Sequence, residues 1–156
     1  MGQRIYTVPI ENVAIGTAVQ DIFSLLCGAS NGIELHHIHL EANVSAEAAL
    51  RMRLKRGTAT VTQGSGGTVV TAPPLDVNDA ALSGVTCHIN DTTQATTTGA
   101  FTTLAGFFWD VALPFDHMPA PEDRETCTVS QALILDLPAT ITATTISGYL
   151  KFRQLP

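Results

Sequence analysis

The segment from Leu50 to Arg56 alternates between apolar and basic side chains, and this pattern constrains the fold more than any other in the sequence. Its apolar positions are Leu50, Met52 and Leu54, and its basic positions are Arg51, Arg53 and Lys55, followed by Arg56. A period of two residues is typical of a β-strand with one buried face. We therefore expect the apolar face to lie in a core and the basic face to meet solvent or a partner.

Other segments along the chain also have the patterns of β-strands. Short apolar or alternating runs, separated by turn signals, predict strands at residues 5–10, 21–26, 33–41, 85–89, 104–113, 129–137 and 144–152. Threonine is abundant and favours strands over helix interiors. The sequence predicts an all-β fold: an antiparallel, jelly-roll-like sandwich of about eight strands in a single domain over residues 1–156.

Two local features modify this plan. Residues 1–10 are expected to form an N-terminal arm or an edge strand, because Pro9 cannot donate a ladder hydrogen bond. Residues 76–84 predict one short helix, with Asp76 as its N-cap and Gly84 at its end.

The charge content bears on partners. Only 14% of the residues are charged and 45% are hydrophobic, so an oligomer that hides part of the surface is expected. The net charge of −6 argues against nucleic acid as the main partner. We also expect no secretion signal and no membrane-spanning segment, since no apolar run is long enough. Cys27, Cys87 and Cys127 have no metal-ligand or disulfide spacing, which favours free thiols in a reducing compartment.

The histidine-rich segment around His36 is the main candidate for a metal site. On a strand, His37 and His39 share a face, where two imidazoles can bind one ion with Glu41 as a third ligand. The alternation around these histidines is irregular, which predicts either two buried faces or a β-bulge nearby. The favoured interpretation is structural, with the histidines partly buried or at a subunit interface, so neither a metal nor another cofactor is expected.

Further motifs also have structural explanations. The glycine-rich segment at residues 63–68 lacks the lysine of a phosphate-binding loop and the spacing of a nucleophile elbow, so a mobile loop is expected. Asp76, Asn78 and Asp79 lack the glycine and the distant glutamate of a calcium loop. Glu122 and Asp123 lie in a proline-rich loop and are better explained as a rim contact with a partner than as an acid–base pair. The sequence therefore predicts no catalytic residues.

The chain resembles a family of tailed-bacteriophage head proteins that decorate, or cement, the capsid. The resemblance spans nearly the whole chain, and its segments are the following: Arg4–Pro9 with Glu11–Val13, Leu50–Gly57 leading to the Gly-Ser-Gly-Gly loop and Pro73-Pro74, Leu75–Ala81, Pro119–Arg124, and Ser147–Leu150.

The resemblance implies a structural virion protein on the capsid exterior, assembled in the host cytoplasm. Such a protein binds across neighbouring major capsid subunits as a homotrimer. The interface residues expected from this reading are Arg4, Tyr6, Arg51, Arg53, Lys55, Arg56, Glu122 and Asp123. The alternatives are another virion part, such as a tail or fibre adaptor, and a jelly-roll sugar-binding module or metal-dependent enzyme.

Overall fold

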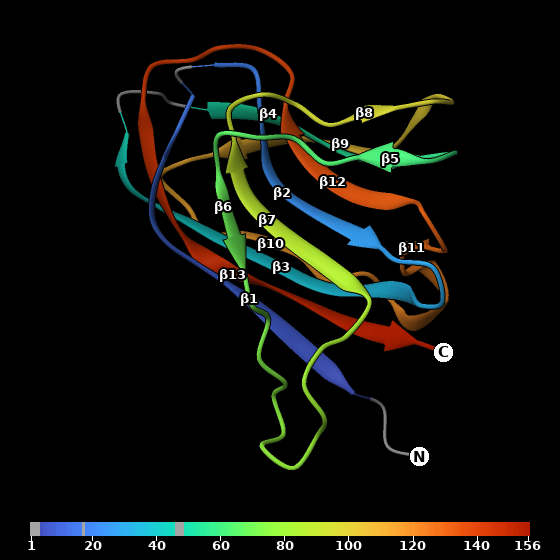
Figure 1. Ribbon diagram of the computed structural model, residues 1–156. Coiled ribbons are helices and arrows are strands. Elements are labelled where there is room, and N and C mark those ends of the chain that lie inside the picture. Colours follow the sequence, from blue (N-terminus) through green and yellow to red (C-terminus); the bar gives the residue numbers. More distant parts are fainter. Residues whose placement is uncertain (1–3, 17, 46–48) are drawn as a thin grey trace.

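Two antiparallel sheets face each other in the computed structural model, which describes residues 4–16, 18–45 and 49–156 (Figure 1). Sheet A has the order β1 (Ile5–Ile15), β13 (Thr144–Leu155), β3 (Gly32–Ser45) and β10 (Phe115–His117), and β11 (Thr126–Cys127) also pairs with β3. Sheet B has the order β6 (Thr68–Val70), β7 (Val85–Asp91), β2 (Gln20–Cys27), β12 (Ala132–Leu137), β4 (Ala49–Gly57) and β9 (Phe101–Asp110). The short strands β5 (Val61–Thr62) and β8 (Thr96–Thr97) form a separate ribbon.

The strand pairing is that of a jelly roll. Along the chain, β1 pairs with β13, β2 with β12, β3 with β10 and β4 with β9, so the pairs nest inside one another. Rolling up this nested hairpin places β13 against β3 and β12 against β4, which are the contacts that join the nested pairs within each sheet. The predicted all-β, jelly-roll-like sandwich is therefore confirmed.

The core lies between the sheets and follows the alternation in the sequence. Leu50, Met52 and Leu54 of β4 are fully buried, as their spacing predicts. Sheet A contributes its own alternate positions, including Ile146, Leu150 and Phe152 of β13. Most members of this core cluster are large aliphatic or aromatic side chains, and their removal from water is the main force that holds the sheets together.

Residues 58–100 form an excursion between β4 and β9, although these two strands are neighbours. The excursion crosses to the far edge of sheet B, where β7 pairs with β2 and β6 pairs with β7. The β5–β8 ribbon lies over the outer face of sheet B, where Val61 and Ala95 pack on Ala132 and Ile134 of β12. This cover explains why β12 is buried on both faces.

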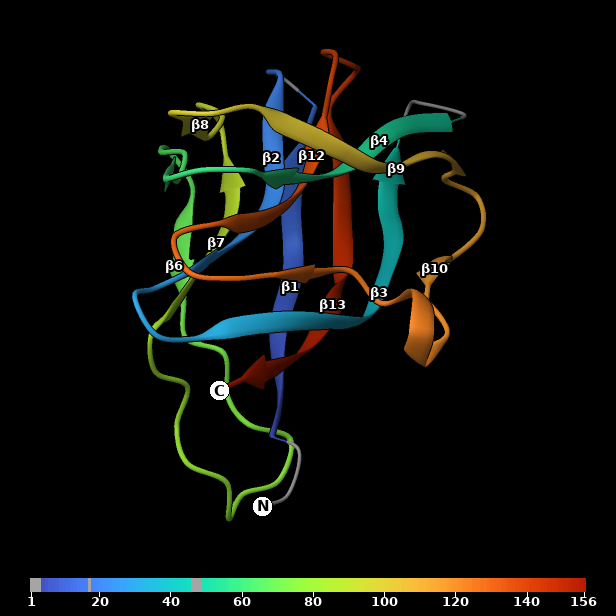
Figure 2. The same cartoon turned by 90° about the vertical axis from the view of Figure 1, so that its right-hand side faces the viewer.

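The predicted helix at residues 76–84 is wrong. Asp76 caps a single turn instead: Asn78 N donates to Asp76 Oδ1 at 2.9 Å, and Asp79 N donates to the Asp76 carbonyl at 3.0 Å. Val77 is 91% exposed, so the segment has no apolar face that would hold so short a helix against the sheets. The segment belongs to a loop between β6 and β7 that projects beyond the sheets (Figure 2).

The described part of the N-terminal segment is a strand of the chain's own sheet and not a free arm. β1 pairs with β13 from Ile5 to Ile15, and a register shift lies between Ile10 and Val13. Residues 73–75 cover part of its other edge, where Thr7 N donates to the Pro73 carbonyl and Leu75 N to the Ile5 carbonyl. Residues 1–3 lie outside the described part of the chain.

Helical structure in the described residues is limited to a short 3₁₀ turn, Pro121–Asp123. None of the helical segments in the described ranges is long and apolar enough to cross a membrane.

Candidate functional site

A β-bulge in β3 sets the direction of the histidine side chains. His37 is opposite Lys151 of β13, and Leu35 is opposite the next residue, Phe152, so His36 is the extra residue of the bulge. The bulge lets Leu35 and Ile38 both point into the core. His37 and His39 then share the outer face of sheet A, and the bulge expected from the irregular alternation is confirmed.

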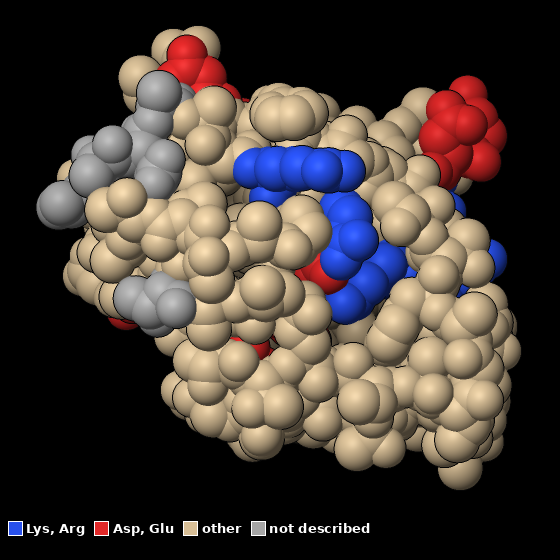
Figure 3. Space-filling model, turned by 90° about the horizontal axis from the view of Figure 1, so that it is seen from above, with Lys and Arg blue, Asp and Glu red and all other residues tan. Residues whose placement is uncertain are grey.

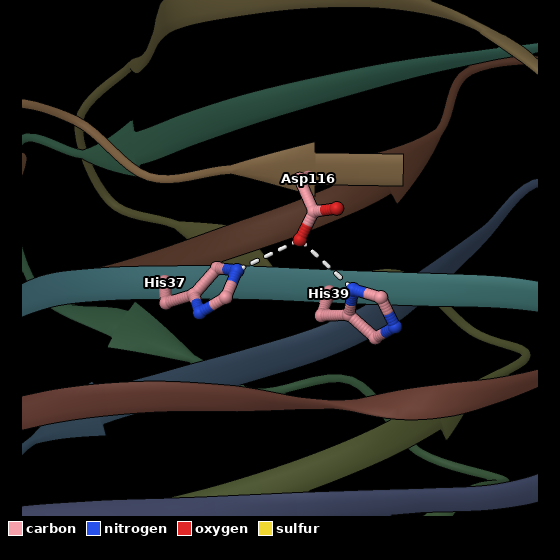
Figure 4. A group of neighbouring side chains, drawn as sticks. All are labelled: His37, His39 and Asp116. Atoms are coloured by element: carbon pink, nitrogen blue, oxygen red, sulfur yellow. Dashed lines mark hydrogen bonds and ion pairs between the residues drawn. The ribbon is translucent and has the colours of Figure 1, made fainter. Parts of the chain in front are cut away.

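Asp116 joins the two histidines from the neighbouring strand β10, where it is directly opposite His39 (Figure 4). Its Oδ1 atom lies 2.9 Å from His37 Nε2 and 2.8 Å from His39 Nδ1. The hydrogen bond to Asp116 raises the pKa of His39, and the two histidines lower the pKa of Asp116. Asp116 is 54% exposed, so the cluster is open to solvent.

Glu41 has a different position from the one expected of a third ligand. It lies on the far side of His39, with Oε1 at 3.3 Å from Nε2. Tyr149 of β13 packs on both imidazoles, stacked on His39 and edge-on to His37, with ring centroids 5.2 Å apart in each case. Asp116 was missed from the sequence, because its segment has the composition of a loop and the β3–β10 pairing joins distant parts of the chain.

A second charged group lies on the same strand around Glu34. Its carboxylate contacts Arg153 at 2.8 Å, Arg124 at 3.1 Å and His36 at 3.0 Å. Burial acts to raise the pKa of Glu34, but the arginines and His36 outweigh it and hold that pKa below its ordinary value. Burial and the Arg124 charge lower the pKa of His36. His36 is therefore part of a structural ion network.

The outer face of sheet B carries a buried ion cluster centred on Asp136. Arg53 donates to both carboxylate oxygens of Asp136, at 3.0 and 2.7 Å, and Lys55 Nζ lies 2.9 Å from Oδ2. Asp21 lies 3.5 Å from the same Nζ and accepts from the Ala95 amide at 2.7 Å. Burial raises the pKa of Asp21, whereas the bonds from Arg53 and Lys55 outweigh burial at Asp136 and lower its pKa.

This ion cluster shows that part of the predicted basic face does not meet solvent or a partner. Lys55 is buried beneath the excursion, with Nζ 4.6 Å from the Phe101 ring centroid, and cannot contact a partner. Arg53 is half-buried on Asp136, and Arg56 donates to the Thr126 carbonyl at 3.0 Å. Asp21 and Asp136 were missed because each occurs as a single acid inside an apolar run.

Arg51 remains exposed, and Phe108 of β9 is directly opposite it. Phe108 is 82% exposed, although it is a large aromatic residue in a regular strand. We call Arg51 and Phe108 the sheet B outer patch. Seen from above in Figure 3, lysine and arginine atoms gather on one face with acidic atoms among them.

The other expected interface residues divide into exposed and buried ones. Arg4, Glu122 and Asp123 are exposed. Tyr6 is fully buried, so its prediction as a partner contact is wrong. Its ring packs on Phe152 with centroids 5.7 Å apart, and its hydroxyl donates to the Ala80 carbonyl at 3.0 Å.

Two of the three buried cysteines contact each other. The Sγ atoms of Cys27, at the end of β2, and Cys127, in β11, lie 2.7 Å apart, so this pair joins sheet B to sheet A. The hydrogen bond from Cys127 lowers the pKa of Cys27, and burial raises the pKa of Cys87 to about 12.

No known protein family and no curated protein matches this sequence. The crystal structure of the infectious bursal disease virus VP2 subviral particle aligns with 99% of this chain and 40% of its own chain, at 13% identity and a TM-score of 0.14. A TM-score this low does not indicate a shared fold, and the jelly roll is identified from the strand pairing alone.

Proposed function

We propose that the chain is a structural virion protein that decorates a phage capsid as a homotrimer, binding across neighbouring major capsid subunits from the capsid exterior. The observation that carries the proposal is the sheet B outer patch, where an exposed phenylalanine lies beside an exposed arginine. Aromatic residues and arginine are the residue types that dominate binding energy at protein interfaces.

The physical character of the chain supports this role. A charge content of 14% leaves a surface that is poor in charge, and Leu113 and Met118 add exposed apolar side chains after β9 and β10. Surfaces of this kind are typical of protein–protein contacts. Repeated symmetric contacts on a shell give avidity, so each contact needs only modest affinity.

The position of the histidines supports assembly over a jelly-roll enzyme of the kind that holds a metal inside its barrel. The interior between the sheets is filled by the apolar cluster, whereas His37 and His39 lie on the outer face of sheet A. The proposal therefore assigns no catalytic residue.

The test is binding of the purified chain to expanded, empty capsids of the phage that encodes it, measured by cosedimentation. We expect saturation at a copy number set by the capsid lattice, and a loss of binding of about tenfold or more for Phe108→Ser and for Arg51→Ala. Val77→Ser is the matched control, because it also removes an exposed apolar side chain but lies in the projecting loop.

Absence of the chain from purified virions would overturn the proposal. A few copies per virion would favour the tail or fibre alternative instead. Equal binding by Phe108→Ser, Arg51→Ala and Val77→Ser would show that the sheet B outer patch is not the contact.

A further inference from the structure

We propose that His37, His39 and Asp116 form a binding site for a divalent transition-metal ion such as Zn²⁺ on the outer face of sheet A. This inference does not depend on the capsid role, because the site lies on the other sheet from the sheet B outer patch.

The donor atoms already converge. His37 Nε2, His39 Nδ1 and Asp116 Oδ1 all lie within 4.8 Å of one another, and both nitrogens are within 2.9 Å of the same oxygen. Zinc binds nitrogen and oxygen ligands at about 2.0–2.2 Å, so donors around a tetrahedral ion lie about 3.3 Å apart. Each nitrogen–oxygen distance therefore needs to lengthen by only a few tenths of an ångström, and the donor atoms are nowhere more than 4.8 Å apart.

The surroundings hold the ligands in the orientation that a metal requires. Glu41 lies at hydrogen-bond distance from the Nε2 atom of His39; when Nε2–H donates to Glu41, the Nδ1 atom on the Asp116 side is free to bind a metal in place of its hydrogen bond to Asp116. A carboxylate on the second ring nitrogen is the usual support of a metal-binding histidine. The Tyr149 ring packs on both imidazoles and limits their rotation.

The charge of the site also suits a cation. Asp116 and Glu41 place two carboxylates beside the two imidazoles. The ammonium of Lys151, the residue opposite His37, lies 4.5 Å from the centroid of the Tyr149 ring. Three protein ligands leave at least one coordination position for water or for an acidic group from another molecule.

The experiment is calorimetric titration of Zn²⁺ into the full chain after removal of metals with a chelator. We expect one site per chain with micromolar affinity. His37→Ala, His39→Ala and Asp116→Asn should each weaken binding about a hundredfold or more, and Glu41→Gln about tenfold. His88→Ala is the matched control, since His88 also bonds a carboxylate, Asp91 at 3.1 Å, but lies outside the cluster.

Cobalt substitution gives a second readout that identifies the ligands. Visible bands of Co²⁺ bound by nitrogen and oxygen, lost in the double variant His37→Ala/His39→Ala, would support the proposal. Thiolate bands would place the metal on cysteines, and either that result or the absence of saturable binding would overturn it. Asp116→Asn keeps nearly the same shape at a solvent-open position, so its loss of binding cannot be ascribed to unfolding.

Discussion

Glu34 illustrates how a single side chain organises the outer face of sheet A. One carboxylate holds arginines from β13 and from the segment after the 3₁₀ turn, together with His36 at the bulge. These contacts join β13 and the segment after the 3₁₀ turn to β3. A carboxylate with such partners is favoured in its charged form, and its contribution to stability therefore depends on pH.

We expect Glu34→Gln to lower the free energy of unfolding by about 2 kcal/mol near neutral pH, because the arginines lose their charged acceptor. The folded pKa of Glu34 lies below its ordinary value of 4.5, so its stabilisation is complete above that value and is lost as the pH falls through the folded pKa. The difference between wild type and variant should thus shrink on acidification, as measured by urea denaturation across a pH series.

Glu122→Gln is the control for this series, because Glu122 is exposed and should show a small difference at every pH. A cost for Glu34→Gln that stays constant down to about pH 3 would contradict the ionic explanation.

Sequence reasoning succeeded at residues whose environment is set by their own strand. The spacing of His37 and His39 correctly placed both on one face, and the alternation of Leu50, Met52 and Leu54 correctly identified core positions. It failed at Lys55 and Asp116, whose surroundings come from segments distant in the sequence. Burial of Lys55 requires the excursion to fold back over sheet B, and no local pattern encodes that.

At the scale of elements, Gly148 shows how closely β13 fits between β1 and β3. Its φ is +152°, and an added Cβ would lie 2.0 Å from the His39 carbonyl oxygen and 3.0 Å from Leu40 Cα. Both obstacles are backbone atoms, which cannot move aside without disturbing the pairing. The absence of a side chain at Gly148 therefore allows β13 to approach the β3 backbone at His39.

We expect Gly148→Ala to destabilise the protein by at least about 2 kcal/mol, because the methyl group would force β13 away from β3. Gly106→Ala in β9 is the matched control, since its Cβ would meet nothing within 4 Å and the loss of backbone freedom in the unfolded chain should leave stability unchanged or slightly higher. Thermal unfolding measures both, and an equal effect of the two substitutions would refute the packing argument.

Strands with an apolar pattern of their own could be predicted from the sequence, whereas strands defined by a distant partner could not. Every predicted strand range overlaps an observed strand, because each carries enough apolar residues to mark a buried face. β10 and β11 were missed, since strands of two or three residues are defined by their partner β3 and not by their own sequence. The helix prediction at residues 76–84 failed because good capping residues do not replace an apolar face.

At the scale of the whole molecule, the proposed trimer predicts the mass of the protein in solution. We expect light scattering on the purified chain to give three chain masses, since a surface with so little charge favours association. Phe108→Ser should stay trimeric while losing capsid binding, if the sheet B outer patch faces the capsid. A strict monomer at high concentration would contradict the trimer.

The nested pairing of the jelly roll has a consequence for the order of events during synthesis. β13 is the last of these strands to leave the ribosome, yet it lies between β1 and β3 and pairs with both. Sheet A therefore cannot close before β13 has been made, and until then β1 lacks its partner, which is about 140 residues away. We expect sheet A to form late and slowly, which makes the stage before β13 is available the one most exposed to aggregation and to capture by chaperones.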